Sequence, residues 1–253
     1  MPPFSLTGRT ALVTGGTSGI GLALTHALVE AGARRVVVVG RNSARLAAVA
    51  AIRPVVVTPY RVDLAEPADV ERLLGDVATA APDLSLVVNN AGTQRLTDFT
   101  REDALAVLPA LRAEIAANLT GVVALSAGLL PLLARQPSAA LVNVTSGLAL
   151  APKRSAPVYC ATKAAVRSFT RALRYQCEDG GLPVRVIEAL PPLVDTPMTA
   201  GRGRAKMSPE RCAAEILAGV RRGATEIAVG RTRVLRLLQR VSPALAYRVM
   251  RDG

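Results

Sequence analysis

The sequence predicts a single α/β domain, spanning residues 1–253, in which helices flank a Rossmann-like, doubly wound parallel β-sheet of about seven strands. Short apolar runs of strand length alternate with helical patterns along the whole chain. The first of these runs ends in a glycine-rich turn, and small or polar residues follow several of the others. No Ser/Gly-rich linker divides the 253 residues, half of which are hydrophobic.

The first strand, residues 9–14, leads into Gly15-Gly-Thr-Ser-Gly19-Ile-Gly21 and then into a helix that ends at Gly32. Glycine allows the backbone to approach a pyrophosphate, and the N–H groups of a helix N-terminus favour an anion. This context of strand, turn and helix predicts a dinucleotide site. The predicted contacts are Gly15, Thr17, Ser18, Gly19, Ile20 and Gly21.

The second strand, residues 35–40, predicts the preferred cofactor. A carboxylate at its end would bind the ribose 2′-hydroxyl and repel a 2′-phosphate. The chain has Gly40-Arg41-Asn42 there instead, so we expect NADP(H) to be preferred, with Arg41 and Asn42 as contacts. NAD(H) stays an alternative, because Arg41 could simply be solvated.

Two further strands are predicted over residues 54–61 and 84–88, with a helix over 66–81 between them. Asp63 and Leu64 would meet an adenine edge. The fourth strand closes on Asn89-Asn90-Ala91-Gly92, where small residues let the backbone pass close to a cofactor, although a plain turn would look similar. The predicted contacts are Asp63, Leu64, Asn90, Ala91 and Gly92.

A long helix is predicted from about Pro109 to Ala134, and it carries no charge from Ile115 onward. Its length would allow a membrane span. The polar residues and Pro131 within it favour a buried helix of a soluble protein instead. Asn118 lies inside this helix, and a buried asparagine should have a hydrogen-bond partner.

The fifth strand, residues 139–144, is followed by Ser146, at the strand end where open α/β sheets place their ligands. Tyr159 and Lys163 come next, one turn apart on a helix, with Cβ atoms about 5–6 Å from each other. We expect the nearby ammonium to lower the phenol pKa from about 10, which would suit proton exchange with an alcohol or carbonyl oxygen. Alone, such a pair occurs on many helices by chance.

The rest of the sheet and the substrate region follow. A sixth strand is predicted over residues 184–189, a helix over 209–222 and a seventh strand over 225–229. The substrate-loop region spans about residues 191–222, and residues 147–158 and 193 to about 207 would build the substrate pocket. Three cations in it would attract an acidic substrate or would be solvated: Arg202, Arg204 and Lys206.

The last segment, about 231–253, is a basic amphipathic tail, with a helix break predicted at Ser242-Pro243. Residues 201–253 carry a balance of +8 out of a net charge of +12. We expect the tail to pack on its own or a sister subunit, with membrane binding as the alternative. Aromatic residues are 3% of the chain and Trp is absent, which argues against nucleic-acid binding.

The numbers and positions of the cysteine and histidine residues limit which metal sites and catalytic groups the chain can form. Three separated cysteines and one histidine offer no spacing for a metal site, so we expect no metal and no His-based triad. Reduced thiols and the lack of a secretory pattern at the N-terminus favour a cytoplasmic protein.

Taken together, the motifs resemble the short-chain dehydrogenase/reductase family. Thr14-Gly-x-x-x-Gly19-x-Gly21 matches its cofactor motif and Asn89-Asn-Ala-Gly92 its structural motif. Asn118, Ser146, Tyr159 and Lys163 match its catalytic tetrad. The segments 89–95, 144–149, 156–163 and 191–198 resemble the DltE-type branch of bacterial oxidoreductases. Pro191-Pro192 departs from the Pro-Gly that many members have.

The resemblance implies NADP(H)-dependent interconversion of a ketone or aldehyde and an alcohol. Tyr159 would be the general acid/base and Ser146 would polarise the carbonyl. Lys163 would lower the tyrosine pKa and bind the nicotinamide ribose, and Asn118 would hold a water that links Lys163 to solvent. The implied cofactor contacts also include Tyr159, Lys163, Pro191, Val194 and Thr196.

Two alternatives of other classes remain at this point. One is a non-catalytic NADP(H)-binding sensor, which would be free to lose the tyrosine or the lysine. The other is a basic protein that binds a membrane or nucleic acid through its tail. The resemblance also implies a small-molecule carbonyl or alcohol substrate and a homodimer or homotetramer, with the helices near 109–134 and 157–178 at the subunit interfaces.

Overall fold

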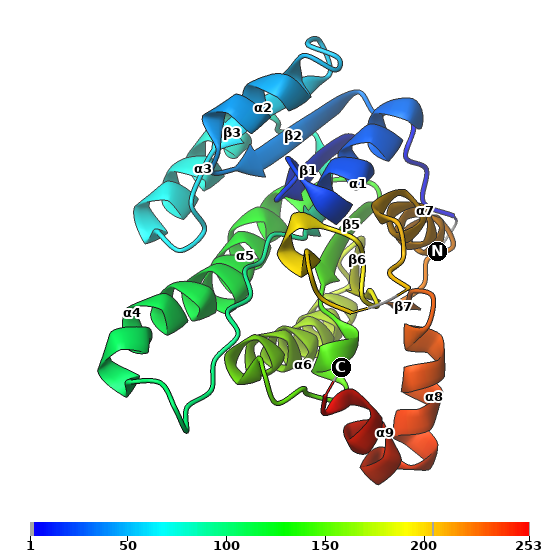
Figure 1. The fold of residues 1–253 in the computed structure, drawn as a ribbon. Helices are drawn as coiled ribbons and strands as arrows, with labels where there is room; N and C mark the ends of the chain where they lie inside the picture. Colours follow the sequence, from blue (N-terminus) through cyan, green and yellow to red (C-terminus); the bar gives the residue numbers. More distant parts are fainter. Residues whose placement is uncertain (1–2, 204, 253) are drawn as a thin grey trace.

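The computed structural model describes residues 3–203 and 205–252, and within them seven parallel strands form one sheet (Figure 1). The strand order is β3-β2-β1-β4-β5-β6-β7. The strands are β1 (Thr10–Thr14), β2 (Arg35–Gly40), β3 (Val57–Arg61), β4 (Leu84–Asn89), β5 (Ala139–Val144), β6 (Val184–Leu190) and β7 (Glu226–Ala228). The predicted doubly wound parallel sheet is confirmed.

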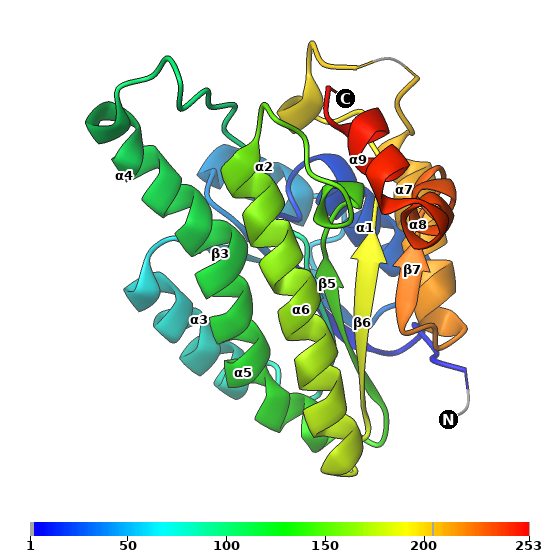
Figure 2. The ribbon, with the colours of Figure 1, turned by 90° about the horizontal axis from the view of Figure 1, so that it is seen from below.

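Helices cover both faces of this sheet, because its central strands are buried along their whole length (Figure 2). One face packs against α1 (Gly19–Glu30), α2 (Ser43–Ala50) and α7 (Pro209–Arg221). The other packs against α3 (Pro67–Ala80), α5 (Gly121–Ala134) and α6 (Pro157–Asp179). The core therefore lies in two layers, one on each side of the sheet.

One helix was not predicted from the sequence, and two element starts differ from the prediction by several residues. The Asn42 side chain caps α2, a helix that the apolar pattern did not reveal, by accepting a hydrogen bond from the Arg45 N–H at 2.9 Å. α4 (Ala104–Ile115) begins at Ala104 and not at Pro109, because Asp103 caps it and the proline is accommodated inside. β3 begins at Val57 and not at Pro54.

The long apolar helix is interrupted at Asn118. A π-helical turn, η1 (Ala116–Thr120), joins α4 to α5, and such turns often occur at functional sites. Leu105–Ala134 is long and apolar enough to cross a membrane by length and composition alone. In this structure its α5 part packs on α3 and α6.

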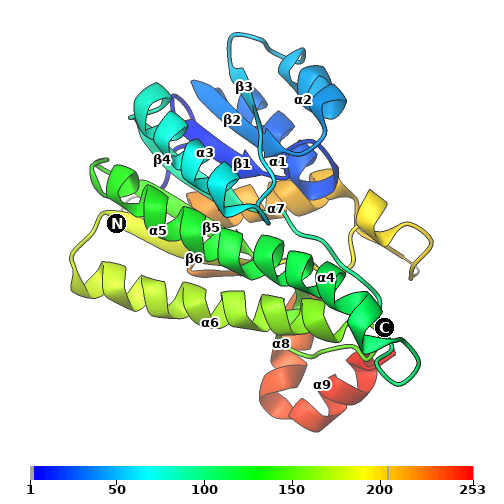
Figure 3. The ribbon, with the colours of Figure 1, turned by 90° about the vertical axis from the view of Figure 1, so that its left-hand side faces the viewer.

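The basic tail forms two helices, α8 (Thr232–Val241) and α9 (Pro243–Met250), with the predicted break at Ser242. They make a hairpin that stands away from the sheet beyond α6 (Figures 1 and 3). Two 3₁₀ turns complete the substrate side: η2 (Gly147–Ala149) follows β5, and η3 (Pro197–Thr199) follows β6.

Candidate active site

The site lies where the strand order reverses, between β1 and β4. The Thr14 hydroxyl, at the end of β1, accepts hydrogen bonds from the Asn90 and Ala91 N–H groups, both at 3.0 Å. The Asn90 side-chain amide in turn donates to the Thr14 carbonyl at 3.0 Å. These bonds join the loops after the two strands and keep the backbone between them open to a ligand.

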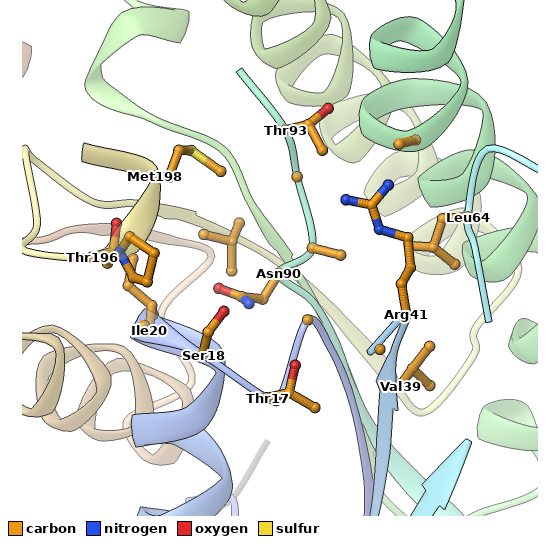
Figure 4. Close-up of a pocket in the computed structure, with 18 of the residues that line it drawn as sticks. Thr17, Ser18, Ile20, Val39, Arg41, Leu64, Asn90, Thr93, Thr196 and Met198 are labelled. Carbon is orange, nitrogen blue, oxygen red and sulfur yellow. The ribbon is translucent and has the colours of Figure 1, made fainter. Parts of the chain in front are cut away.

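A cavity of about 490 Å³ follows this edge of the sheet. At one end it reaches Arg41 and Leu64, at the other Thr196 and Met198, with Asn90 between them (Figure 4). Most predicted cofactor contacts line it: Gly15, Thr17, Ser18, Gly19, Ile20, Arg41, Asn42, Asp63, Leu64, Asn90, Ala91, Gly92, Tyr159, Lys163, Pro191 and Thr196.

Two predicted contacts lie outside this lining. Gly21 is buried in α1, where a Cβ would stand 2.1 Å from the Gly15 carbonyl oxygen, so this glycine lets the helix pack onto the turn. Val194 is 3% exposed and packs in the core, and its carbonyl accepts a hydrogen bond from the Thr199 hydroxyl at 2.5 Å. Both residues are buried next to the cavity and support the segments that line it.

Several lining residues were not predicted from the sequence, and Arg45 is the most informative of them. It lies in the first turn of α2, one turn beyond Arg41, and it follows the cap formed by Asn42. An unrecognised Asn-capped helix start was the signal that could have placed it. The others are Val39, Gly40, Val62, Thr93, Ala117, Val144 and Thr145. Pro197 and Met198, which also line the cavity, lie in the segment predicted to build the substrate pocket.

The glycine turn has the form of a phosphate cradle. Gly15 and Gly19 both adopt left-handed backbone conformations, with φ of 65° and 50°. A Cβ at Gly19 would lie 2.8 Å from the Thr196 Cγ2 atom, so a side chain there would collide with the opposite wall of the cavity. The open cradle before α1 fits the phosphates of a dinucleotide, and Arg41 and Arg45 lie at the far end of the cavity.

The four residues predicted to form a catalytic group converge from three elements. Tyr159 and Lys163 lie on α6, Ser146 caps η2, and Asn118 lies in η1. All but Ser146 are at most 9% exposed. The Lys163 Nζ atom donates to the Val144 carbonyl at 2.9 Å and stands 5.7 Å from the centre of the Tyr159 ring.

The pKa of Tyr159 differs in direction from the sequence expectation. Burial raises it to about 12, and the Cys160 side chain adds to this, while a hydrogen bond with Ser146 acts in the opposite direction. Lys163 faces the ring and donates to a carbonyl, so its charge does not offset the loss of solvation. Burial also lowers the pKa of Lys163 itself, to about 8.

A buried carboxylate stands beside the tetrad. Glu114, in the last turn of α4, is 3% exposed, and its Oε2 atom accepts a hydrogen bond from the Arg95 N–H at 3.3 Å. Its Oε1 atom has no hydrogen-bond partner among the described residues. Burial raises the Glu114 pKa, and its charge adds to the raised pKa of Tyr159.

Two of the three cations expected on the substrate side are described by the structure, and both are paired within the protein. Arg202 donates to the Gln94 side chain at 2.5 Å, which links the loop after β6 to the loop after β4. Lys206 pairs with Asp195 at 3.1 Å and donates to the Thr199 carbonyl at 2.7 Å. Arg204 lies outside the described residues. Arg202 and Lys206 thus have partners within the protein.

This fold and site define a dinucleotide-dependent oxidoreductase, and the chain has relatives of that kind. A profile described as short chain dehydrogenase matches residues 9–206. The uncharacterised oxidoreductase DltE of Bacillus subtilis (strain 168) is 43% identical over 191 residues, 76% of this chain and 73% of the relative. An uncharacterised oxidoreductase of Staphylococcus aureus (strain N315) is 32% identical over 221 residues, 84% of this chain and 90% of the relative.

The chain therefore belongs to the short-chain dehydrogenase/reductase family of NAD(P)-binding oxidoreductases, and the resemblance to its DltE-type branch is confirmed. Solved structures agree with this assignment. A short chain dehydrogenase from Burkholderia cenocepacia J2315 in complex with NADP has a TM-score of 0.86 at 27% identity and covers 99% of this chain and 100% of its own. A short-chain dehydrogenase from Sphingobium yanoikuyae in complex with NADPH has a TM-score of 0.77 at 27% identity, covering 87% of each chain.

Proposed function

We propose that the protein is an NADP(H)-dependent oxidoreductase that interconverts a small ketone or aldehyde and the corresponding alcohol. The observation that supports this function most strongly is a single cavity whose two ends are lined by different kinds of residue. Arg41 and Arg45 lie after β2, whereas Tyr159 and Lys163 lie beside β5. With β1 and β4 between them, these strands are roughly 14 Å apart, a span that suits a dinucleotide.

The two arginines support NADP(H) over NAD(H). No carboxylate follows β2 directly, and Arg41 makes one long ion pair with Asp63, at 3.5 Å between an exposed guanidinium and a partly exposed carboxylate. Such a pair contributes little, so the guanidinium is available to a ribose phosphate. The relatives solved with NADP and NADPH, each at 27% identity, support the same preference.

When bound, the cofactor supplies or accepts the hydride. The glycine turn and the N-terminus of α1 would hold its phosphates, Arg41 and Arg45 its ribose phosphate, and Lys163 and Thr196 its nicotinamide half. The protein's own chemistry is then a proton transfer at the Tyr159 hydroxyl. Burial keeps that phenol protonated at neutral pH, which is the form needed to donate to a carbonyl oxygen as it gains charge.

The remaining tetrad residues position this transfer. The Ser146 hydroxyl accepts a hydrogen bond from the Leu148 N–H at 3.1 Å. Ser146 also acts to lower the pKa of Tyr159, so a carbonyl oxygen would lie beside both hydroxyls. A Cβ at Gly92 would lie 3.3 Å from the Asn118 Oδ1 atom and 3.5 Å from the Lys163 Nζ atom. Asn118 and Lys163 thus both lie next to Gly92, and we propose that Asn118 holds a water that connects Lys163 to solvent.

The proposed cofactor preference is tested by fluorescence titration with NADPH and NADH. We expect tight NADPH binding, weak NADH binding and unchanged NADPH binding by Tyr159→Phe. The proposed reaction is tested by a screen of ketones and aldehydes with NADPH, in which the Tyr159→Phe variant should lose turnover. Preference for NADH would refute the role of the arginines, and a near-normal rate for Tyr159→Phe would refute the mechanism.

We also propose a homo-oligomer assembled through the α4–α5 unit and α6. Apolar side chains are exposed on these helices, among them Leu105 at 77% and Tyr175 at 53%. Light scattering of the purified protein distinguishes a dimer or tetramer from a monomer, and a monomer at all concentrations would refute this assembly.

A further inference from the structure

The α8 helix carries an apolar stripe that faces away from the protein. Val234, Leu237, Leu238 and Val241 recur at helical spacing within an arc of roughly 100°. Val234, Leu237 and Val241 are 69%, 63% and 77% exposed. Three large apolar side chains on one short helix, each mostly exposed, form a patch that no described residue covers.

The opposite side of α8 holds the helix on the protein. Thr232 is 2% exposed, and the Leu235 side chain packs against Gly147, where a Cβ would meet it at 3.2 Å. The Arg236 side chain pairs with Glu226 at 3.4 Å. Because these contacts fix the rotation of the helix, the outward direction of the stripe is a property of the fold.

Cations flank the stripe. By helical position Arg231 lies beside one edge and Arg240 beside the other, and α9 adds Arg248. In the described part of the chain these three arginines form no ion pair, whereas Arg233 pairs with Glu215 at 2.7 Å. The one acidic side chain of residues 231–253, Asp252, pairs with Arg154 at 2.7 Å.

The position of the α8–α9 hairpin in the fold leaves it accessible to a flat surface such as a membrane. α8 and α9 project beyond α6, and the views in Figures 1 and 3 agree on this. On α9, Leu245 and Val249 add apolar surface that is 43% and 59% exposed. Apolar side chains and unpaired arginines therefore share the outermost part of the molecule.

We propose that the α8–α9 hairpin docks the protein on an anionic membrane surface. Val234, Leu237 and Val241 would enter the acyl boundary, and Arg231, Arg240 and Arg248 would contact the headgroups. Charge argues against a second copy as the occupant, because a two-fold contact would bring the unpaired arginines of both copies together with no acid to offset them. The proposal does not depend on the reaction at the active site.

The docked orientation would bring the substrate side near the membrane. Leu235 and Thr232 contact Gly147, which directly follows Ser146, and the Arg154 N–H donates to the Arg251 carbonyl at 3.0 Å. The hairpin thus abuts the loop between β5 and α6 that leads to Tyr159. This loop therefore lies next to the hairpin that would contact the membrane.

Vesicle flotation of the full chain tests the proposal. The probes are vesicles of phosphatidylcholine alone and of phosphatidylcholine mixed with phosphatidylglycerol, at low and at physiological salt. We expect binding to the anionic vesicles that weakens with salt. The variant V234S/L237S/V241S should lose most of this binding, and each substitution in R231Q/R240Q/R248Q should weaken it by about fivefold.

Matched controls separate docking from general surface effects. Val55→Ser and Arg101→Gln change residues that are also highly exposed but lie elsewhere, and they should bind vesicles as the wild type does. NADPH binding should be the same in every variant, which confirms that each is folded. Failure of the wild type to bind anionic vesicles would overturn the proposal. So would undiminished binding by V234S/L237S/V241S, or a loss of self-association in that variant with no effect on vesicles.

Discussion

The Asn118 side-chain amide binds both backbone groups of Thr93: its Oδ1 atom accepts from the Thr93 N–H and its Nδ2 atom donates to the Thr93 carbonyl, each at 2.8 Å. The π-helical turn points this side chain at the segment after β4, which lines the cavity. The amide also donates to the Thr162 hydroxyl at 3.3 Å, so one buried residue ties η1, the loop and α6 together.

Asn118→Ala should therefore lower both stability and activity. Loss of the paired bonds leaves buried groups unsatisfied, at a cost of about 1–3 kcal/mol in the free energy of unfolding, and it frees the loop that carries Thr93. Denaturant unfolding and the rate of carbonyl reduction measure the two effects. Asn143→Ala is the control, because Asn143 is equally buried and hydrogen-bonds Asn89 and Thr170 away from the cavity. Equal loss of rate in both variants would contradict a specific role for Asn118.

The raised pKa of Tyr159 predicts opposite pH dependences for the two directions of the reaction. Reduction needs the protonated phenol, which predominates well below a pKa of about 12, so its rate should be flat across neutral pH. Oxidation needs the phenolate, so its rate should rise with pH by about tenfold per unit. Initial rates in both directions with NADPH and NADP⁺ check this. An oxidation rate that levels off near neutral pH would show that the bound state lowers the Tyr159 pKa.

Glu114→Gln should move that oxidation profile to lower pH. The Glu114 carboxylate adds to the raised pKa of Tyr159, and the amide removes the charge while keeping an oxygen acceptor for the Arg95 N–H. Cys160, Ser146 and Arg202 also act on the phenol and are unchanged in this variant.

Glu102→Gln is the matched control for this shift. Glu102 binds the same loop through the Asp98 N–H at 2.8 Å and the Arg95 side chain at 2.9 Å, but it is not among the groups that shift the Tyr159 pKa. A purely structural role for Glu114 would change the rate without moving the profile, and that result would contradict the electrostatic account.

Arg41→Ala and Arg45→Ala should each weaken NADPH binding by about ten- to hundredfold, the loss expected for a charge-assisted hydrogen bond. NADH binding should stay the same, because that cofactor lacks the phosphate these side chains would contact. Fluorescence titration measures both constants. Arg53→Ala, an exposed arginine beyond α2, should change neither. Similar losses for NADPH and NADH would mean that the arginines support α2 and do not select the cofactor.

The order of the strands could be predicted from the sequence because the buried strands are short, mostly apolar runs, several of which end in a polar or glycine motif. The spacing of Tyr159 and Lys163 was enough to place both on one helix face. What the pattern could not show depends on three-dimensional packing. Glu114 lies in a helix whose start at Ala104 was missed, and only the fold brings it beside Tyr159.

Burial also decides the electrostatics of the site, and burial is not visible in a local sequence window. Proximity of Lys163 predicted a lowered tyrosine pKa, whereas the fold places its ammonium against the ring and the Val144 carbonyl. The exposure of Val234, Leu237 and Val241 could not be predicted for the same reason. Their helical spacing is evident in the sequence, but the rotation of α8 depends on the contacts of Thr232 and Leu235 with the rest of the fold.

Two glycines in helices should respond in opposite ways to alanine. A Cβ at Gly21 would stand 2.1 Å from the Gly15 carbonyl oxygen and 2.6 Å from the Asn90 Nδ2 atom, both in the floor of the cofactor cradle. Gly21→Ala should therefore push the turn out of place, lower the melting temperature and abolish NADPH binding. At Gly75, inside α3, a Cβ would meet nothing within 4 Å.

Gly75→Ala should accordingly stabilise the protein by about 0.5–1 kcal/mol, because alanine loses less backbone entropy than glycine in a helix, and it should leave NADPH binding unchanged. Thermal unfolding and NADPH titration of the two variants give the comparison directly. If Gly21→Ala were as stable as the wild type and bound NADPH normally, the close packing of α1 on the glycine turn could not be what this position requires.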